Sequence, residues 1–291
     1  MGVTLRMSHD QFQEFLASKW DSQQILWEKA EPHLQRKGGC LTYDDTLVDK
    51  PYSNETKPVH YQWSGVHKQV MKGINITSLV WTDGDKKIPF DFQMYDKPND
   101  GKTKNQLARE MITRAKERGF EPEVVLFDSW FSGKENLKQL QEYSWKFLVE
   151  VKCNRTIDSK RVDELEIPQE GKIAHLKSFG KVKVFRKTFR NEWRYYVTND
   201  LNMVYEQFKT YWKKRWKIEE YHRGVKQFCR VAQCKARMKQ SQEHHIVCAI
   251  VAFIKYEINR LKHAISYDEQ RLRPRRDAIR RQVWHPDYAW A

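Results

Sequence analysis

The stretch YWKKRWKIEEYHRGVK (residues 211–226) places two adjacent glutamates, Glu219 and Glu220, inside one of the most basic parts of the chain. Its pattern predicts a helix, and at about 100° per residue the two side chains fall on different faces. Glu220 is predicted to face solvent. Glu219 shares its face with one aromatic residue and three cations, which are Trp212, Arg215, Arg223 and Lys226. A more apolar face is predicted to pack on a sheet and holds Tyr211, Ile218, Tyr221, Val225 and Cys229.

The charges around Glu219 have two interpretations. A ladder of i,i+4 ion pairs would stabilise the helix by about 0.2–0.5 kcal/mol per pair and would need no function. It would not explain why an aromatic residue and a lysine, both suited to contacting DNA, stand at the two ends of this face. A metal-dependent nuclease, in contrast, needs a carboxylate among such groups.

Two more candidate carboxylate positions end predicted strands upstream of this helix. Asp128 follows the apolar run 124–127, and Asp44 and Asp45 close a short strand at 40–44. Strand ends in α/β sheets are where catalytic groups collect, although Asp128 could simply cap a helix and the Asp pair could begin a turn. Together with Glu219, these positions suggest two-metal phosphodiester chemistry, and oxygen ligands favour Mg²⁺ or Mn²⁺.

The composition agrees with a polyanionic partner. The 291 residues include 53 Lys and Arg against 38 Asp and Glu, a net charge of +15, and basic side chains gain free energy by releasing counterions from phosphates. The 11 Trp, 13 Tyr and 14 Phe make the chain too aromatic for a disordered basic protein. The N-terminus has no signal-peptide pattern and the longest apolar run, 246–254, is too short to span a bilayer. We therefore expect a cytoplasmic protein with no membrane partner.

Periodicity predicts a mixed α/β chain. A helical region at 8–35 is followed by the strand 40–44, a polar irregular segment at 47–72 and a hairpin of strands 74–81 and 88–95. Then come a helix at 103–118, the strand 124–127, a helix at 133–143 and the strand 146–151. Short β-like pieces fill 152–198, helices are predicted from 199 to about 263, and the basic tail is expected to be mobile.

These residues resemble the DDE transposases of bacterial insertion sequences, in particular the cut-and-paste subgroup with a Tyr-Arg-Glu-Lys signature. Arg215, Glu219 and Lys226 fit the signature spacing, while Trp212 occupies the tyrosine position, with Tyr211 one residue earlier. The first carboxylate of the family is typically the Asp before Thr, which is Asp45 in YDDT. The second follows a short apolar strand, as Asp128 does in VVLFDSWFS.

The resemblance implies an RNase H-like mixed sheet flanked by helices, with a β-rich insertion between the second Asp and the catalytic Glu. The expected parts are a short helical N-terminal region (1–37), a first part of the catalytic core (38–151), the insertion (152–198), a helical remainder of the core (199–263) and a basic C-terminal tail (264–291). The N-terminal region is shorter than in relatives, so either the chain is a truncated copy or the recognition of transposon ends rests on the insertion and the basic C-terminal part. In the insertion, Trp193 stands where relatives place a tryptophan that receives a flipped base.

The resemblance also implies a function. Asp45, Asp128 and Glu219 would hold two Mg²⁺ or Mn²⁺ ions, and Arg215 and Lys226 would contact phosphate, with Trp212 or Tyr211 at the tyrosine position. The partners would be terminal inverted repeats and target DNA, bound by a homodimer on the bacterial nucleoid. Two alternatives are a truncated or domesticated copy acting as a non-catalytic DNA-binding regulator, and another RNase H-like nuclease.

Overall fold

The centre of the protein is a mixed β-sheet in which β1 (Cys40–Asp49) pairs with another strand on each of its two sides. The computed structural model describes residues 8–65 and 68–284. On one side of β1, β5 (Val124–Phe127) and then β6 (Phe147–Val151) run parallel to it. On the other side, β3 (Gln69–Thr82) is antiparallel to β1 and forms a hairpin with β4 (Lys87–Tyr95). This part of the sheet confirms the predicted mixed α/β class.

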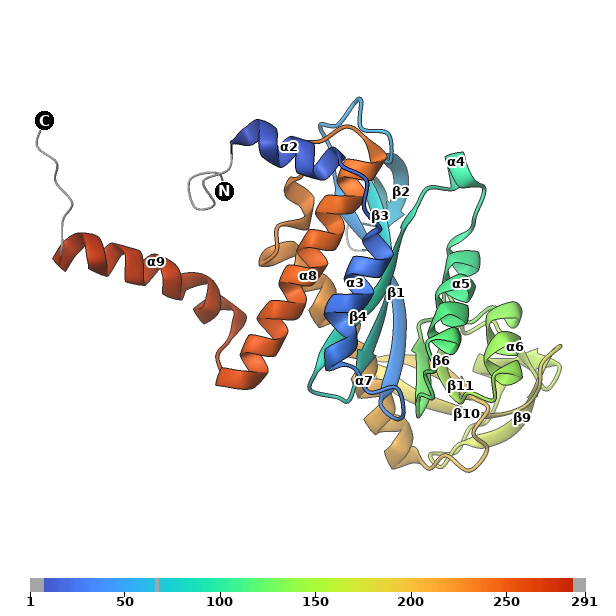
Figure 1. The fold of residues 1–291 in the computed structure, drawn as a ribbon. Helices are drawn as coiled ribbons and strands as arrows, with labels where there is room; N and C mark the ends of the chain where they lie inside the picture. Colours follow the sequence, from blue (N-terminus) through green and yellow to red (C-terminus); the bar gives the residue numbers. More distant parts are fainter. Residues whose placement is uncertain (1–7, 66–67, 285–291) are drawn as a thin grey trace, which may run out of the picture.

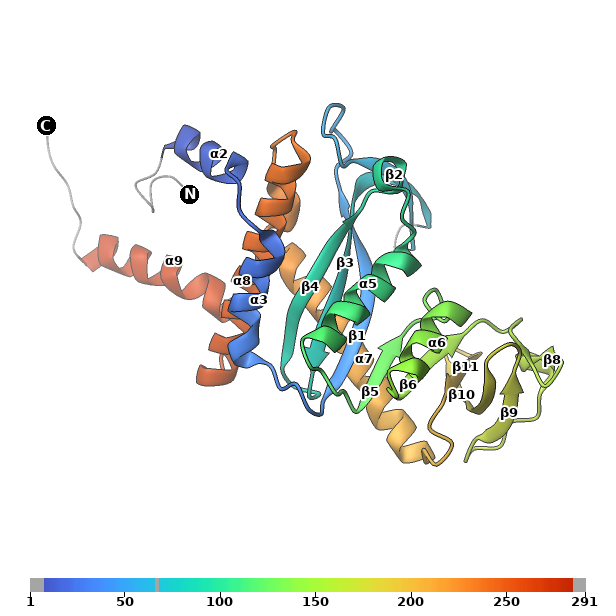
Figure 2. The ribbon, with the colours of Figure 1, turned by 45° about the vertical axis from the view of Figure 1, so that its right-hand side comes forward.

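The sheet continues beyond β6 into the segment that was predicted to be β-rich. β11 (Glu192–Thr198) pairs antiparallel with β6, and β10 (Gly180–Phe189) pairs antiparallel with β11. The outer strands are β9 (Lys172–Leu176), β7 (Thr156–Ile157) and β8 (Lys160–Arg161). With β2 (His60–Ser64) on β3, the sheet has eleven strands. Figure 2 shows that the added strands extend the sheet away from the helices at its other end.

Helices cover both faces of the sheet. α5 (Lys104–Glu117) packs on β3 and β4 and is joined by α6 (Lys134–Glu142). α7 (Tyr205–Gln227) crosses β1 and β5 on the opposite face, and α8 (Lys239–His263) lies beside it on β4 (Figure 1). The remaining short elements are α2 (His9–Ala17), α3 (Ser22–Ala30), α4 (Lys97–Asp100) and the 3-10 turns η1 (Glu31–His33), η2 (Val162–Glu164) and η3 (Val231–Gln233).

The two faces of the sheet are assigned by the alternation of side chains along each strand. Thr77 on β3 donates to the Gln93 carbonyl and touches Met111 of α5, whereas the next residue, Ser78, lies 3.2 Å from the Tyr221 hydroxyl of α7. α7 also approaches α8 closely, because a Cβ at Gly224 would lie 2.4 Å from Cε2 of Phe253. The apolar face of the 211–226 helix therefore packs on the sheet, as predicted, and it also contacts α8.

Several predicted boundaries are corrected. Segment 47–72 was expected to be irregular, yet it contains the end of β1, all of β2 and the start of β3, because backbone pairing with the long β3 overrides its polar composition. Residues 228–238 interrupt the helical region after 199. The basic tail forms α9 (Tyr267–Trp284), which extends away from the sheet in Figure 1, and residues 285–291 lie outside the described part of the chain. Within the described residues, no helix is long and apolar enough to cross a membrane.

A buried ionic network ties α8 to the β3–β4 hairpin. Glu257 is fully buried, lies 3.2 Å from Lys87 Nζ and 2.9 Å from Arg260 Nε, and accepts a hydrogen bond from the Tyr267 hydroxyl. Burial alone would raise the pKa of the Glu257 carboxyl, but the hydrogen bonds from Arg260 and Tyr267 and the charge of Lys87 outweigh it, and the pKa is lowered. Glu257 therefore stays ionised in the folded protein.

We expect Glu257→Gln to lower the free energy of unfolding by about 3–5 kcal/mol, because it leaves the charge of Lys87 buried with less compensation. Since the pKa of Glu257 is lowered on folding, its stabilisation is present above the ordinary pKa and is lost as the pH falls through the lowered value. Urea unfolding between about pH 3 and 7 measures both effects. The substitution Glu142→Gln, at an exposed position, serves as control, and an equal loss in both variants would contradict the network.

Candidate active site

Strand β1 sends its two adjacent aspartates to opposite faces of the sheet. Asp45 points toward α5, where its Oδ2 lies 2.7 Å from Lys104 Nζ and 2.5 Å from Asn75 Nδ2. Asp44 points toward α7 and is only 9% exposed, and its Oδ1 accepts the Asp45 backbone N–H at 2.8 Å. The alternation of a strand forbids both side chains from facing α7.

Asp128 lies next to Asp44 because β1 and β5 are parallel neighbours. Their register pairs Thr42 with Leu126, so two residues further along both strands Asp44 lies alongside Asp128. The Asp128 side chain also accepts the Trp130 backbone N–H at 2.9 Å. Asp128 therefore caps the turn that follows β5 rather than a helix, since α6 begins at Lys134 with Gly133 as its N-cap, and it also contributes a carboxylate to the α7 face.

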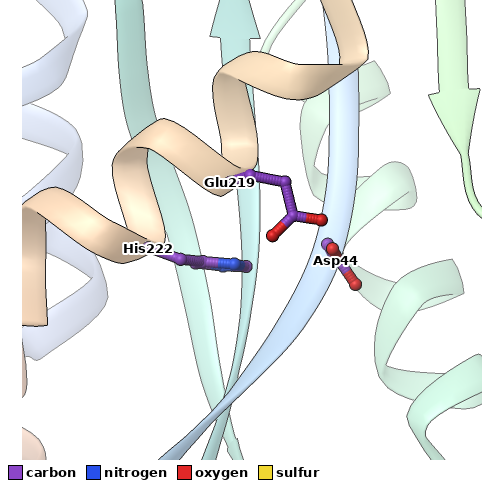
Figure 3. A group of neighbouring side chains, drawn as sticks. All are labelled: Asp44, Glu219 and His222. Carbon is purple, nitrogen blue, oxygen red and sulfur yellow. The ribbon is translucent and has the colours of Figure 1, made fainter. Parts of the chain in front are cut away.

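Helix α7 brings Glu219 to the same place. Arg215 lies between two carboxylates, with Nη1 3.5 Å from Glu219 Oε1 and 3.9 Å from Asp44 Oδ2. His222 follows Glu219 by three residues and shares its side of the helix. One donor atom each of Asp44, Glu219 and His222 lies within 4.8 Å of the other two, and Figure 3 shows the three side chains converging between α7 and β1.

The carboxylates are poorly compensated by protein cations. Burial raises the pKa of the Asp44 carboxyl well above its ordinary value, and repulsion from neighbouring carboxylates raises it further; they are Asp128, Asp45 and Glu219. Burial also raises the pKa of Asp128, and the charge of Arg215 acts against this rise. Closely spaced carboxylate oxygens are the donors that hard divalent cations prefer. The residues present therefore fit a divalent metal.

These groups open into a cavity of about 760 Å³ that the four carboxylates line. Its edge carries three lysines, Lys97, Lys104 and Lys226. It also carries three exposed aromatic side chains, namely Tyr61 (73% exposed), Trp63 (65%) and Trp130 (59%). Cations that can bind phosphates and aromatic rings that can stack on bases are the combination found in grooves for single-stranded nucleic acid.

The structure gathers only part of the predicted site at this cavity. Asp45, Asp128, Glu219 and Lys226 line it, and Arg215 contacts its carboxylates. The other three residues do not line the cavity. Trp212 packs on Tyr196, with 4.7 Å between ring centroids, and the Tyr211 ring lies 5.4 Å from Lys214 Nζ. Trp193 is half exposed on β11, and the Arg186 guanidinium lies 4.6 Å from its ring.

The predicted orientation of Glu220 is wrong. Its carboxylate lies 3.0 Å from Lys217 Nζ and 3.3 Å from Nζ of the buried Lys87. With 31% of its side chain exposed, Glu220 is about as accessible as Glu219, at 35%. The helical wheel could not foresee this, because β4 places Lys87 beneath the face that was expected to meet solvent. The two glutamates differ in their partners rather than in their exposure.

Several residues of the cavity were not selected by sequence reasoning. Asp44 was passed over for its neighbour, and Lys104, Asn75 and Trp130 carried no pattern of their own. His222 did carry a signal, since a spacing of three residues places it on the side of the helix that Glu219 occupies. Which residue pairs with which aspartate depends on strand register, which the sequence does not display.

Comparisons with known proteins identify the family and the fold of the chain. A family model described as a DDE superfamily endonuclease matches residues 2–180, a span that includes both aspartate positions and ends before Glu219. The fold is similar to that of the piggyBac transposase in a cryo-EM structure of its synaptic complex with hairpin DNA, with a TM-score of 0.53 and 14% identity. That match covers 87% of this chain and 55% of the other, so this chain spans about half the length of that transposase. Among curated protein sequences, none matches the chain significantly.

The different surroundings of Asp44 and Asp45 predict opposite effects of their substitution on the free energy of unfolding. In metal-free buffer at pH 7, we expect Asp44→Asn to raise the free energy of unfolding by roughly 0.5–2 kcal/mol, because it removes a buried charge that its neighbours repel. Asp45→Asn should lower it by about 1.5–3 kcal/mol, because Lys104 and Asn75 lose an ionised partner. Urea unfolding with a chelator present measures both variants, and a loss of equal size in the two would show that Asp44 is not a repelled charge.

Proposed function

The chain belongs to the DDE superfamily of endonucleases, and we propose that it is a transposase that cuts DNA at transposon ends and joins them to a target by a cut-and-paste reaction. The observation that carries this proposal is the convergence of Asp44, Asp45, Asp128 and Glu219 at one cavity with a basic and aromatic edge. In a structural ion-pair ladder each carboxylate would be neutralised by a cation, whereas here the single cation Arg215 does not offset the burial and mutual repulsion that raise the pKa values of Asp44 and Asp128.

We propose that Asp45, Asp128 and Glu219 are the catalytic carboxylates and that the site uses two Mg²⁺ or Mn²⁺ ions. Bound there, the ions would activate the attacking oxygen and stabilise the leaving oxygen. Arg215 would hold the Glu219 carboxylate in place, and Lys226 would position the DNA backbone at the cavity. Water would attack in the cleavage step and the freed 3′-OH in the joining step, each in line with its leaving oxygen.

The finer assignment follows the spacing of the helix α7 residues. Arg215, Glu219 and Lys226 support membership of the bacterial insertion-sequence subgroup with a Tyr-Arg-Glu-Lys signature, with Trp212 or Tyr211 in the role of the tyrosine. The half-exposed Trp193 would receive a flipped base. We further propose that two copies assemble on terminal inverted repeats at the nucleoid, and that the chain divides into the five parts given by its sequence.

The catalytic role of Asp128 can be separated from a structural one. We expect Asp128→Ala to reduce cleavage of a DNA substrate by at least about a thousandfold, because the carboxylate that would hold a metal is lost. Binding of the same DNA should stay within about threefold of the wild type, since Asp128 adds negative charge to the cavity. Gel-based cleavage assays with Mg²⁺ or Mn²⁺, paired with fluorescence anisotropy, measure the two quantities.

Two outcomes would contradict this assignment. Loss of DNA binding in Asp128→Ala, together with altered circular dichroism, would mean that the side chain serves mainly as the cap of the turn at Trp130. A wild-type protein that binds DNA but does not cleave it with either metal would favour a non-catalytic DNA-binding regulator.

Lys226 is expected to act through phosphate contact. Lys226→Ala should weaken DNA binding at every sequence and reduce the slope of log K against log salt by about 1. The matched control is Lys213→Ala, which removes an exposed lysine from the same helix outside the cavity. Equal effects of the two substitutions on the salt slope would argue against a specific contact at Lys226.

A further inference from the structure

His222 presents a buried nitrogen that the fold does not use. The residue is 5% exposed, and its Nε2 is buried with no hydrogen-bond partner among residues 8–65 and 68–284. An unpaired buried polar atom costs about 1–3 kcal/mol. The neighbouring Tyr221 is also buried, but its hydroxyl has a hydrogen-bond partner, Ser78 Oγ, at 3.2 Å. The unpaired nitrogen of His222 is therefore available to a ligand.

The surroundings of His222 favour a cation as that ligand. Nε2 of the imidazole has no hydrogen-bond partner among the described residues, and the ring shares its surroundings with the carboxylates of Asp44 and Glu219. Neutral imidazole is the form that binds metals. The ring points toward the carboxylates of Glu219 and Asp44 (Figure 3), which supply the negative charge that a cation requires.

The distances suit one octahedral ion. Metal–ligand bonds of about 2.1 Å place neighbouring donor atoms roughly 3 Å apart and opposite ones roughly 4.2 Å apart. The donor atoms of the three side chains already lie within 4.8 Å of one another, so small side-chain rotations would let all three contact one ion, and water would supply the remaining ligands. Glu219 and His222 come from one turn of α7 and Asp44 from the middle of β1, and both elements are fixed by packing.

Asp44 is the β1 carboxylate that can take part. The carboxylate of Asp45 is held by Lys104 and Asn75 on the α5 side of the sheet. The cation nearest to Asp44 is Arg215, at 3.9 Å, which is too long for a hydrogen bond. A cation bound on the α7 face of the sheet would therefore contact Asp44 rather than Asp45.

We propose that Asp44, Glu219 and His222 together hold one divalent cation, with Nε2 of His222 as a nitrogen ligand. The assignment rests on the proposed metal-dependent function and revises it for one of the two ions: Asp44 takes the place of Asp45 as the β1 ligand of that ion, and the nitrogen of His222 joins the carboxylates. Because imidazole is a softer donor than carboxylate, the site should favour Mn²⁺ over Mg²⁺.

The direct test is pulsed electron paramagnetic resonance on the whole chain loaded with Mn²⁺. A nitrogen bound to Mn²⁺ gives a ¹⁴N coupling, and incorporation of ¹⁵N-histidine should convert it to the ¹⁵N pattern. This measurement needs no variant, so a substitution that unfolds the protein cannot leave the proposal untested. Bound Mn²⁺ without any nitrogen coupling would overturn the role of His222.

Two pairs of variants test which histidine supplies the bound nitrogen and which aspartate binds the ion. His222→Gln should abolish the coupling and weaken Mn²⁺ binding at least roughly tenfold, whereas the exposed His175→Gln should change neither. Asp44→Asn should likewise weaken Mn²⁺ binding, and Asp45→Asn should keep the nitrogen-coupled ion. The reverse order for the two aspartates would overturn the assignment of Asp44.

Cleavage by the wild type separates this proposal from the proposed function. Metal-dependent cleavage without nitrogen coupling would overturn the mixed site and leave the transposase proposal standing. Nitrogen-coupled Mn²⁺ without cleavage under any metal would support the mixed site and count against the enzyme. The wild type should also bind Mn²⁺ more tightly than Mg²⁺ in calorimetry, and the His222→Gln variant should lose that preference.

Discussion

A β-strand cannot turn two consecutive side chains to the same face, and this constraint organises the site. Asp44 and Asp45 are neighbours in sequence, yet one meets α7 and the other meets α5. The carboxylate of Asp45 accepts hydrogen bonds from Lys104 and Asn75. Asp44 lies near Asp128 and Glu219 instead, and their negative charges repel its own. The electrostatic difference between two identical residues follows from the pleat of one strand.

Helix α7 completes the arrangement because its position is fixed on both sides. Tyr221 reaches Ser78 of the sheet, and Gly224 lets the helix approach Phe253 of α8 without a side chain between them. Glu219 and His222 are thereby held over the middle of β1 rather than at its end. The site is built on rigid elements, which is the condition for holding several like charges close together before any ligand binds.

The sequence was informative where periodicity or spacing alone decides structure. The apolar run before Asp128, the hairpin around 82–87 and the buried face of α7 were predicted and are confirmed. Segment 47–72 was missed because its strands are stabilised by pairing with β3, which involves residues distant in sequence. The orientation of Glu220 and the partners of Asp44 depend on the same long-range pairing. Helical phase locates a side chain on its own element but says nothing about what the neighbouring element places opposite it.

The unbroken sheet between β5 and β10 has a mechanical consequence. β6 and β11 share backbone hydrogen bonds, and neighbouring strands in a sheet are held about 4.8 Å apart. The β10–β11 hairpin and the carboxylates are therefore separated by a fixed number of strand spacings rather than by a hinge. A molecule bound to the β10–β11 hairpin would therefore lie at a constant distance from the acidic cavity.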